Sequence, residues 1–139
     1  MRLTVLAMLL LLVPGGSQAA TAPPETTAFR RCMDAVDLSA FKTSQWQGCY
    51  EAELKRQDAV LNAAYKTVGA AAAPEARTLL VKGQKAWLTY REAWCRFEET
   101  TPNAPGGAVN YAACLVELTV AQIRRLQDNG GARLPEAIR

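Results

Sequence analysis

The sequence predicts an all-α protein with three long antiparallel helices and a short N-terminal helix, stapled by two disulfides. Three observations lead to this fold class. Apolar residues recur at spacings of three, four and seven over long stretches, as they do on one face of a helix. Proline and glycine interrupt these stretches at a few points, and no stretch alternates as a strand would. Four cysteines lie in a short chain whose first residues are typical of an exported protein.

The first 19 residues have the features of a signal peptide. Arg2 gives a positive start, an apolar run ends at Val13, and small residues precede a cleavage point after Ala19. The run is shorter than the roughly 20 apolar residues that a membrane span needs. No cysteine follows until Cys32. We therefore expect no membrane anchor, and a periplasmic or secreted protein.

The rest of the chain is long enough for one domain with one core. We expect a flexible leader over residues 20–27, a helical domain over 28–128 and a C-terminal tail over 129–139. Removal of Arg2 lowers the formal net charge from +3 to +2. Basic residues are interspersed with acidic ones and form no concentrated face, so we expect no nucleic-acid partner.

The N-terminal third of the domain should form two helices. A short helix is expected from about Ala28 to Val36, followed by a turn over Asp37–Lys42. The first long helix should begin with Thr43 or Ser44 as N-cap, because a hydroxyl can accept from the exposed amides there. Its apolar stripe consists of Trp46, Tyr50, Leu54, Leu61, Tyr65 and Val68.

The second long helix gives the clearest periodic pattern in the chain. It should run from Pro74, a residue suited to a first helical turn, to about Glu99. Its stripe alternates spacings of four and three through Ala76, Leu80, Gly83, Trp87, Tyr90, Trp94 and Phe97. We expect the aromatic residues Trp87, Tyr90 and Trp94 to pack in the core. No stripe clearly exceeds what the core needs, so the sequence gives no argument for dimerisation.

A loop and a third long helix complete the domain. The loop should cover Thr100–Ala108, which contains two prolines and two glycines and no charge. The helix should span about Val109–Asp128, and Asn129-Gly130-Gly131 should end it. Its apolar face carries Tyr111, Leu115, Leu118, Gln122 and Leu126.

The helix pattern predicts how the cysteines pair. Cys95 lies about one turn before the end of its helix and Cys114 about one turn into the next, so an antiparallel hairpin brings them together. Cys32 and Cys49 flank the preceding turn in the same way. The pairs Cys32–Cys49 and Cys95–Cys114 therefore suit the ~5.5–6 Å Cα separation of a disulfide. A zinc site is the alternative, but close CxxC-type spacing is absent and export favours oxidation.

Three motifs carry a family resemblance. They are Asp58-x-x-Leu61-Asn62-x-x-Tyr65, Gln84-x-x-Trp87-x-x-Tyr90-Arg91-x-x-x-Cys95 and Cys114-x-x-x-x-Thr119. Together they resemble the LprI-like lysozyme-inhibitor family, and the resemblance extends from about Cys32 to Leu126. It implies a small exported helical protein. In one branch of the family it also implies inhibition of lysozyme.

The residue inventory argues against an enzyme. The chain has no histidine, which removes His-based triads and imidazole metal sites. Cysteines in disulfides cannot act as nucleophiles. Glu51 and Glu53 are two residues apart on a helix and point to different faces, so they do not form a catalytic pair. We expect neither a cofactor nor a bound metal.

Two groups of polar residues are candidates for a role. Asn62, Gln84, Arg91 and Thr119 lie beside the apolar stripes. They predict a structural hydrogen-bond network between helices, with a polar binding cleft as the alternative. The second group surrounds the loop tethered by Cys95–Cys114, and we expect it to bind a partner. The alternative is that the segment is an ordinary connection between helices. The group comprises Glu98, Glu99, Pro102, Asn103, Pro105, Gly106 and Gly107.

The function that follows is a binding function. A stiff loop loses little entropy when it binds, so the loop could enter a glycosidase cleft and exclude substrate. The leading hypothesis is an exported protein that inhibits lysozyme-type peptidoglycan hydrolases by steric occlusion. The alternative is a non-catalytic envelope adaptor, or an immunity-type protein that binds another wall-associated partner.

Overall fold

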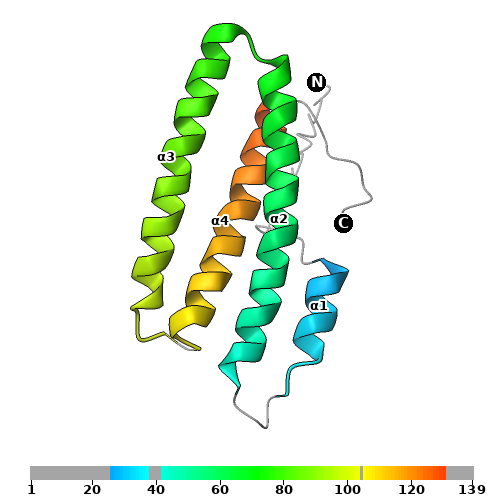
Figure 1. The fold of residues 1–139 in the computed structure, drawn as a ribbon, viewed down its shortest axis with the longest axis vertical. Helices are drawn as coiled ribbons and strands as arrows, with labels where there is room; N and C mark the ends of the chain where they lie inside the picture. Colours follow the sequence, from blue (N-terminus) through cyan, green and yellow to red (C-terminus); the bar gives the residue numbers. More distant parts are fainter. Residues whose placement is uncertain (1–25, 38–41, 104, 131–139) are drawn as a thin grey trace, which may run out of the picture.

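The computed structural model describes residues 26–37, 42–103 and 105–130 as four helices. These are α1 (Thr27–Asp34), α2 (Thr43–Ala71), α3 (Pro74–Glu99) and α4 (Gly107–Gly130), shown in Figure 1. The predicted all-α class and both disulfide pairings are confirmed, which excludes the zinc alternative. The predicted signal peptide, residues 20–25 of the leader, residues 38–41 of the turn and residues 131–139 lie outside the described residues.

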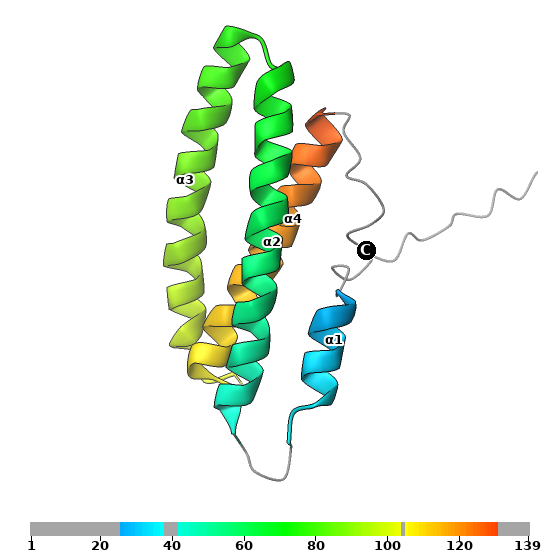
Figure 2. The same ribbon diagram turned by 45° about the vertical axis from the view of Figure 1, so that its right-hand side comes forward.

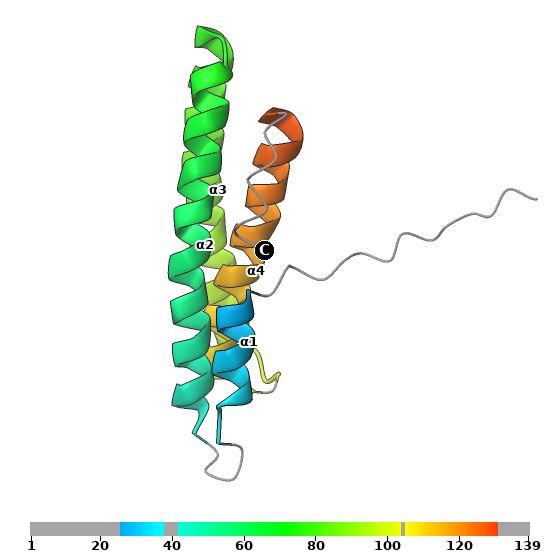
Figure 3. The same ribbon diagram turned by 90° about the vertical axis from the view of Figure 1, so that its right-hand side faces the viewer.

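Helix α4 is the centre of the fold. It packs most extensively against α2 and next against α3, whereas α2 and α3 barely contact each other. Consecutive helices run antiparallel, as predicted, but the best-packed pair, α2 and α4, runs parallel (Figure 1). Helices α4 and α1 lie on the same side of the α2–α3 hairpin (Figure 3). The far end of that hairpin extends beyond the C-terminal end of α4 (Figure 1).

The helix ends differ in part from the prediction. Thr26 caps α1 by accepting from the amide of Phe29, and Pro74 occupies the first turn of α3 as expected. The predicted hydroxyl cap of α2 is wrong, because the helix already includes Thr43 and Lys42 stands at the N-cap position without a side-chain bond. Helix α4 begins at Gly107, where a positive φ of 53° suits glycine.

Two hydrophobic clusters hold α4 in place. Towards its C-terminal end, Ile123 and Leu126 pack with Leu61 and Ala64 of α2, and Leu80 and Trp87 of α3 cover them. Near the loop, the Cys95–Cys114 disulfide packs with Leu115. The predicted stripes include Leu61, Leu115 and Leu126 but leave out Ala64 and Ile123. The buried face of α4 is therefore turned from the predicted one, and it also contains Val109, Ala112 and Val120.

Helix α1 lies beside the N-terminal half of α2 (Figure 2), and a buried carboxylate and a disulfide attach the two helices. Glu53 is 2% exposed and accepts from the Thr26 hydroxyl at 2.7 Å, the Arg56 guanidinium at 2.8 Å and the Gln57 amide at 2.7 Å. These donors replace the water that the carboxylate loses on burial. The Cys32–Cys49 bond, with its Cα atoms 5.7 Å apart, closes the same pair of helices. Glu53 therefore has a structural role.

Candidate partner-binding site

Arg91 connects the three long helices through a compact set of hydrogen bonds. Its guanidinium donates to the Asp58 carboxylate of α2 at 2.9 Å and to the Thr119 hydroxyl of α4 at 2.7 Å. It also lies over the Trp87 ring, 4.9 Å from the ring centroid. Thr119 is fully buried and donates to the carbonyl of Leu115. The arrangement favours the structural interpretation of these polar residues over a cleft that binds a ligand.

The other predicted members of this network are placed separately. Gln84 accepts from the amide of Gln122 at 3.0 Å, which joins α3 to α4. Asn62 lies exposed on α2 and takes no part in these bonds. Its neighbours Leu61 and Ala64 pack against α4, whereas Asn62 lies on another side of the helix. The partners Asp58 and Gln122 were not predicted.

Replacing Arg91 by methionine is expected to lower the free energy of unfolding by about 2 kcal/mol, the scale of lost hydrogen bonds to a charged group. Methionine keeps the apolar stem but leaves Thr119 and Asp58 without their donor. Urea unfolding followed by circular dichroism measures the change. The matched control is Arg96→Met, which removes an exposed arginine of the same helix and should change stability little. Equal effects of the two variants would contradict the assigned role.

The aromatic residues of α3 are not all in the core, contrary to the prediction. Trp87 is half-buried against the core, but Tyr90 is 51% exposed and Trp94 is 43% exposed. Phe97, at 57%, continues the same exposed row. The physical reason is that α3 packs along one edge on α4 and hardly touches α2. Its apolar surface is therefore wider than the surface that it buries.

The loop between α3 and α4 is held by hydrogen bonds at both ends. The hydroxyls of Thr100 and Thr101 donate to the last carbonyls of α3. Asn110, in the first turn of α4, accepts from the amide of Gly106 at 3.2 Å and donates to the carbonyl of Asn103 at 2.9 Å. Gly106 has a φ of 85°, which favours glycine. The Cys95–Cys114 bond joins the two helices on either side of the loop.

A hollow of about 400 Å³, here called the loop hollow, lies beside this loop. Glu98 lies at its edge, where its carboxylate accepts from the Trp94 indole at 2.6 Å. Its lining combines aromatic rings with carboxylates and amides: Trp94, Phe97, Glu98, Thr101, Asn103, Asn110, Ala113, Cys114 and Glu117. Of the predicted partner-binding residues, Glu98 and Asn103 line the hollow. Pro102, Pro105, Gly106 and Gly107 form the loop, and Glu99 faces another cluster.

That second cluster explains how Glu99 is tolerated at the end of α3. The Arg96 guanidinium donates to Glu99 at 2.9 Å and to Glu92 at 3.0 Å, and it lies 4.0 Å from the centroid of the Tyr111 ring. The Tyr111 hydroxyl donates to Glu92, which lowers the pKa of this carboxyl. Burial, reinforced by the same bond, raises the pKa of Tyr111. The Arg96 charge offsets the unfavourable placement of an acid at a helix C-terminus.

Sequence reasoning missed three residues of the site. Asn110 and Glu117 were not singled out, and Phe97 was taken only as part of a core stripe. The position of Asn110 could have been informative, since an asparagine in the first turn of a helix can bind the loop before it. Glu117 and Phe97 could not be found this way, because only the packing angle of α3 against α4 brings them together.

Within the described residues, each buried polar side-chain atom has a hydrogen-bond partner, and all four cysteines are in disulfides. No cluster of acidic or cysteine side chains in the described part of the chain could hold a metal ion. None of the described helices is long and apolar enough to cross a membrane. The loop hollow presents aromatic rings, carboxylates and amides.

Fold and site together define a small disulfide-bridged helical protein. The chain belongs to the lysozyme inhibitor LprI family, whose model matches residues 32–126, from the first cysteine to the last turns of α4. Comparison with curated proteins gives no match, and comparison with solved structures gives none either. Membership of an inhibitor family and the two disulfides point to an extracytoplasmic protein that is not an enzyme.

Proposed function

We propose that this protein is exported and inhibits lysozyme-type peptidoglycan hydrolases by steric occlusion. Membership of the lysozyme inhibitor LprI family is the observation that carries this proposal. The N-terminal features support it, since removal of residues 1–19 would deliver the domain to the periplasm or the medium, where lysozyme acts. Two disulfides suit the same oxidising compartment.

The loop end of the molecule is the surface that we assign to the lysozyme. A glycosidase of this kind holds its two catalytic carboxylates in a cleft on either side of the scissile bond. A segment that fills the cleft blocks the substrate without any chemistry of its own. The loop suits this role because Asn110 and the Cys95–Cys114 bond have already fixed its shape, so little entropy is lost on binding.

The charges around the loop indicate which lysozyme surface fits. Glu98 and Glu117 line the loop hollow, together with Trp94 and Phe97. Carboxylates beside exposed aromatic rings match a partner surface that is cationic and partly apolar. We therefore infer that Glu98 and Glu117 contact basic residues around the cleft, while the loop itself enters it.

The test is lysis of a peptidoglycan suspension by a panel of lysozymes, with the oxidised protein titrated in. Inhibition of at least one lysozyme type should saturate at one inhibitor per enzyme, because occlusion needs one bound copy. Protein that has been reduced and alkylated is the control and should inhibit less. A folded protein that leaves every lysozyme active would overturn the proposal. Binding without loss of lysis would instead indicate the envelope-adaptor function.

A further inference from the structure

The outer side of α3 is apolar along its whole length. Every large hydrophobic side chain that the described part of the chain exposes belongs to this helix. One row of positions, spaced by three or four residues, shares a face: Leu79, Gly83, Ala86, Tyr90, Trp94 and Phe97. Leu79 is 63% exposed. A contiguous apolar face of this kind marks an interaction surface.

The two halves of this row differ in size. In the C-terminal half, Tyr90 and Trp94 stack with their ring centroids 6.1 Å apart, and Phe97 lies 5.5 Å from Trp94. In the N-terminal half, the small residues Gly83 and Ala86 project little from the helix. A Cβ atom added at Gly83 would meet nothing within 4 Å. One half therefore projects rings and the other half offers space.

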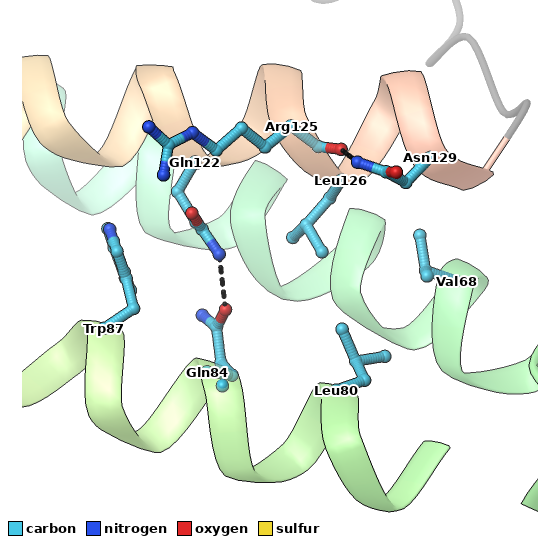
Figure 4. A pocket seen from close by; sticks show the side chains of 9 residues that line it. Val68, Leu80, Gln84, Trp87, Gln122, Arg125, Leu126 and Asn129 are labelled. Carbon is cyan, nitrogen blue, oxygen red and sulfur yellow. Dashed lines mark hydrogen bonds between the residues drawn. The ribbon is translucent and has the colours of Figure 1, made fainter. Parts of the chain in front are cut away.

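The space in the N-terminal half deepens into a second hollow, here called the upper hollow, of about 340 Å³ (Figure 4). Leu80, Gly83, Gln84 and Trp87 contribute from α3, and its remaining lining residues are Val68, Gln122, Arg125, Leu126 and Asn129. Leucine and valine side chains point into it, while Arg125 lies along its α4 side (Figure 4). It is large enough to receive an aromatic ring, and it lies on the same flank of α3 as the exposed rings.

Charge follows the same division. On this flank, Arg125 of α4 lines the upper hollow, whereas Glu98 of α3 and Glu117 of α4 line the loop hollow. The other charges of the C-terminal half of α3 are engaged elsewhere: Arg91 binds Asp58, and Arg96 binds Glu92 and Glu99.

We propose that a second copy of this chain binds along this flank of α3, antiparallel to the first. A two-fold axis near Tyr90 relates the ring pair at positions 94 and 97 to the upper hollow around Gly83. Each copy therefore places its rings in the hollow of the other, and Arg125 of one copy approaches Glu98 of the other. Such an interface is isologous, since the same surface serves both subunits. In this orientation the rings face free space and the basic end of the groove faces the acidic end.

Sedimentation equilibrium of the oxidised full chain across the micromolar range tests this proposal. The measurement is made without lysozyme. Trp94 and Phe97 also line the loop hollow assigned to lysozyme, so a bound lysozyme would compete with the second copy for the same side chains. We expect a dimer. The variant Trp94→Ala/Phe97→Ala should raise the dissociation constant of the dimer by at least about 30-fold, which is the effect of losing one interface hot spot. The matched control, Leu88→Ala, shortens an exposed side chain on the other flank of α3 and should leave the dimer unchanged.

Two further variants probe the hollow and the charge separately. Gly83→Trp fills the upper hollow from a position with open space and should also produce monomers, with helicity by circular dichroism as the check on folding. Arg125→Glu should weaken the dimer, and Arg125→Glu/Glu98→Arg should restore it. A wild-type monomer overturns the proposal and leaves the row to another partner. So does a dimer that withstands Trp94→Ala/Phe97→Ala, or one that Leu88→Ala weakens equally.

Discussion

Replacement of residues 102–107 by a glycine–serine linker of the same length is expected to abolish lysozyme inhibition and to leave the helical content unchanged. The linker removes two prolines and disturbs the hydrogen bond from the Asn110 side chain to the carbonyl at position 103. The loop then no longer presents the same shape to a cleft. A flexible segment must lose conformational entropy when it binds, which raises the dissociation constant. Lysis assays of a sensitive lysozyme measure the inhibition, and circular dichroism measures the helicity.

The matched control is the same kind of linker at the opposite end of α3, in place of the residues that join α2 to α3. That end lies far from the loop hollow, so inhibition should persist there (Figure 1). Asn110→Ala gives an intermediate case, since it removes the two hydrogen bonds that shape the loop but keeps its sequence. It should weaken inhibition without abolishing it. Undiminished inhibition by the protein with the replaced 102–107 loop would rule out the loop as the inserting segment.

Replacement of Cys95 and Cys114 by alanine is expected to lower the free energy of unfolding by roughly 3 kcal/mol, the chain-entropy value for a loop of this size. The cysteines are 19 residues apart, and Cys95 is completely buried between the two helices. Loss of the bond also frees the base of the loop, so inhibition should fall as well. Urea unfolding measures the stability, and the lysis assay measures the function.

The Cys32→Ala/Cys49→Ala variant is the control for this result. Its cysteines are 17 residues apart, so the entropy gained by the unfolded chain is similar. Its bond, however, joins α1 to α2 and leaves the Cys95–Cys114 bond at the base of the loop in place. We expect a loss of stability with inhibition retained. If both variants lost inhibition equally, the loop end would not be the site that matters.

The extent of the helices could be predicted because their causes are local. Pro74 starts α3 where a missing amide proton costs nothing, and the Pro- and Gly-containing stretch 102–107 separates α3 from α4. The disulfides followed from the same information. Once two helices are joined by a short connection, cysteines one turn from the facing ends must lie at the same height, and the Cα separation of Cys95 and Cys114 is 5.5 Å.

The exposed row on α3 could not be predicted, and the reason is geometric. Periodicity shows that Trp87, Tyr90 and Trp94 lie within one broad face of a helix, but it carries no information about how much of that face a neighbour covers. Helix α4 covers only the edge of α3 that contains Trp87 and Arg91, because most of the packing surface of α4 lies against α2. Tyr90 and Trp94 are therefore left outside the core.

The sequence by itself determined the class of this protein: helical, disulfide-bridged, without histidine chemistry, and related to lysozyme inhibitors. Each of these properties depends on residue identity or on spacing within a few turns. Only the tertiary structure decided that α4 lies between α2 and α3, that Asn110 closes the loop and that Phe97 and Glu117 share a hollow. These contacts join residues from different helices, and their distances depend on the angle at which whole helices pack.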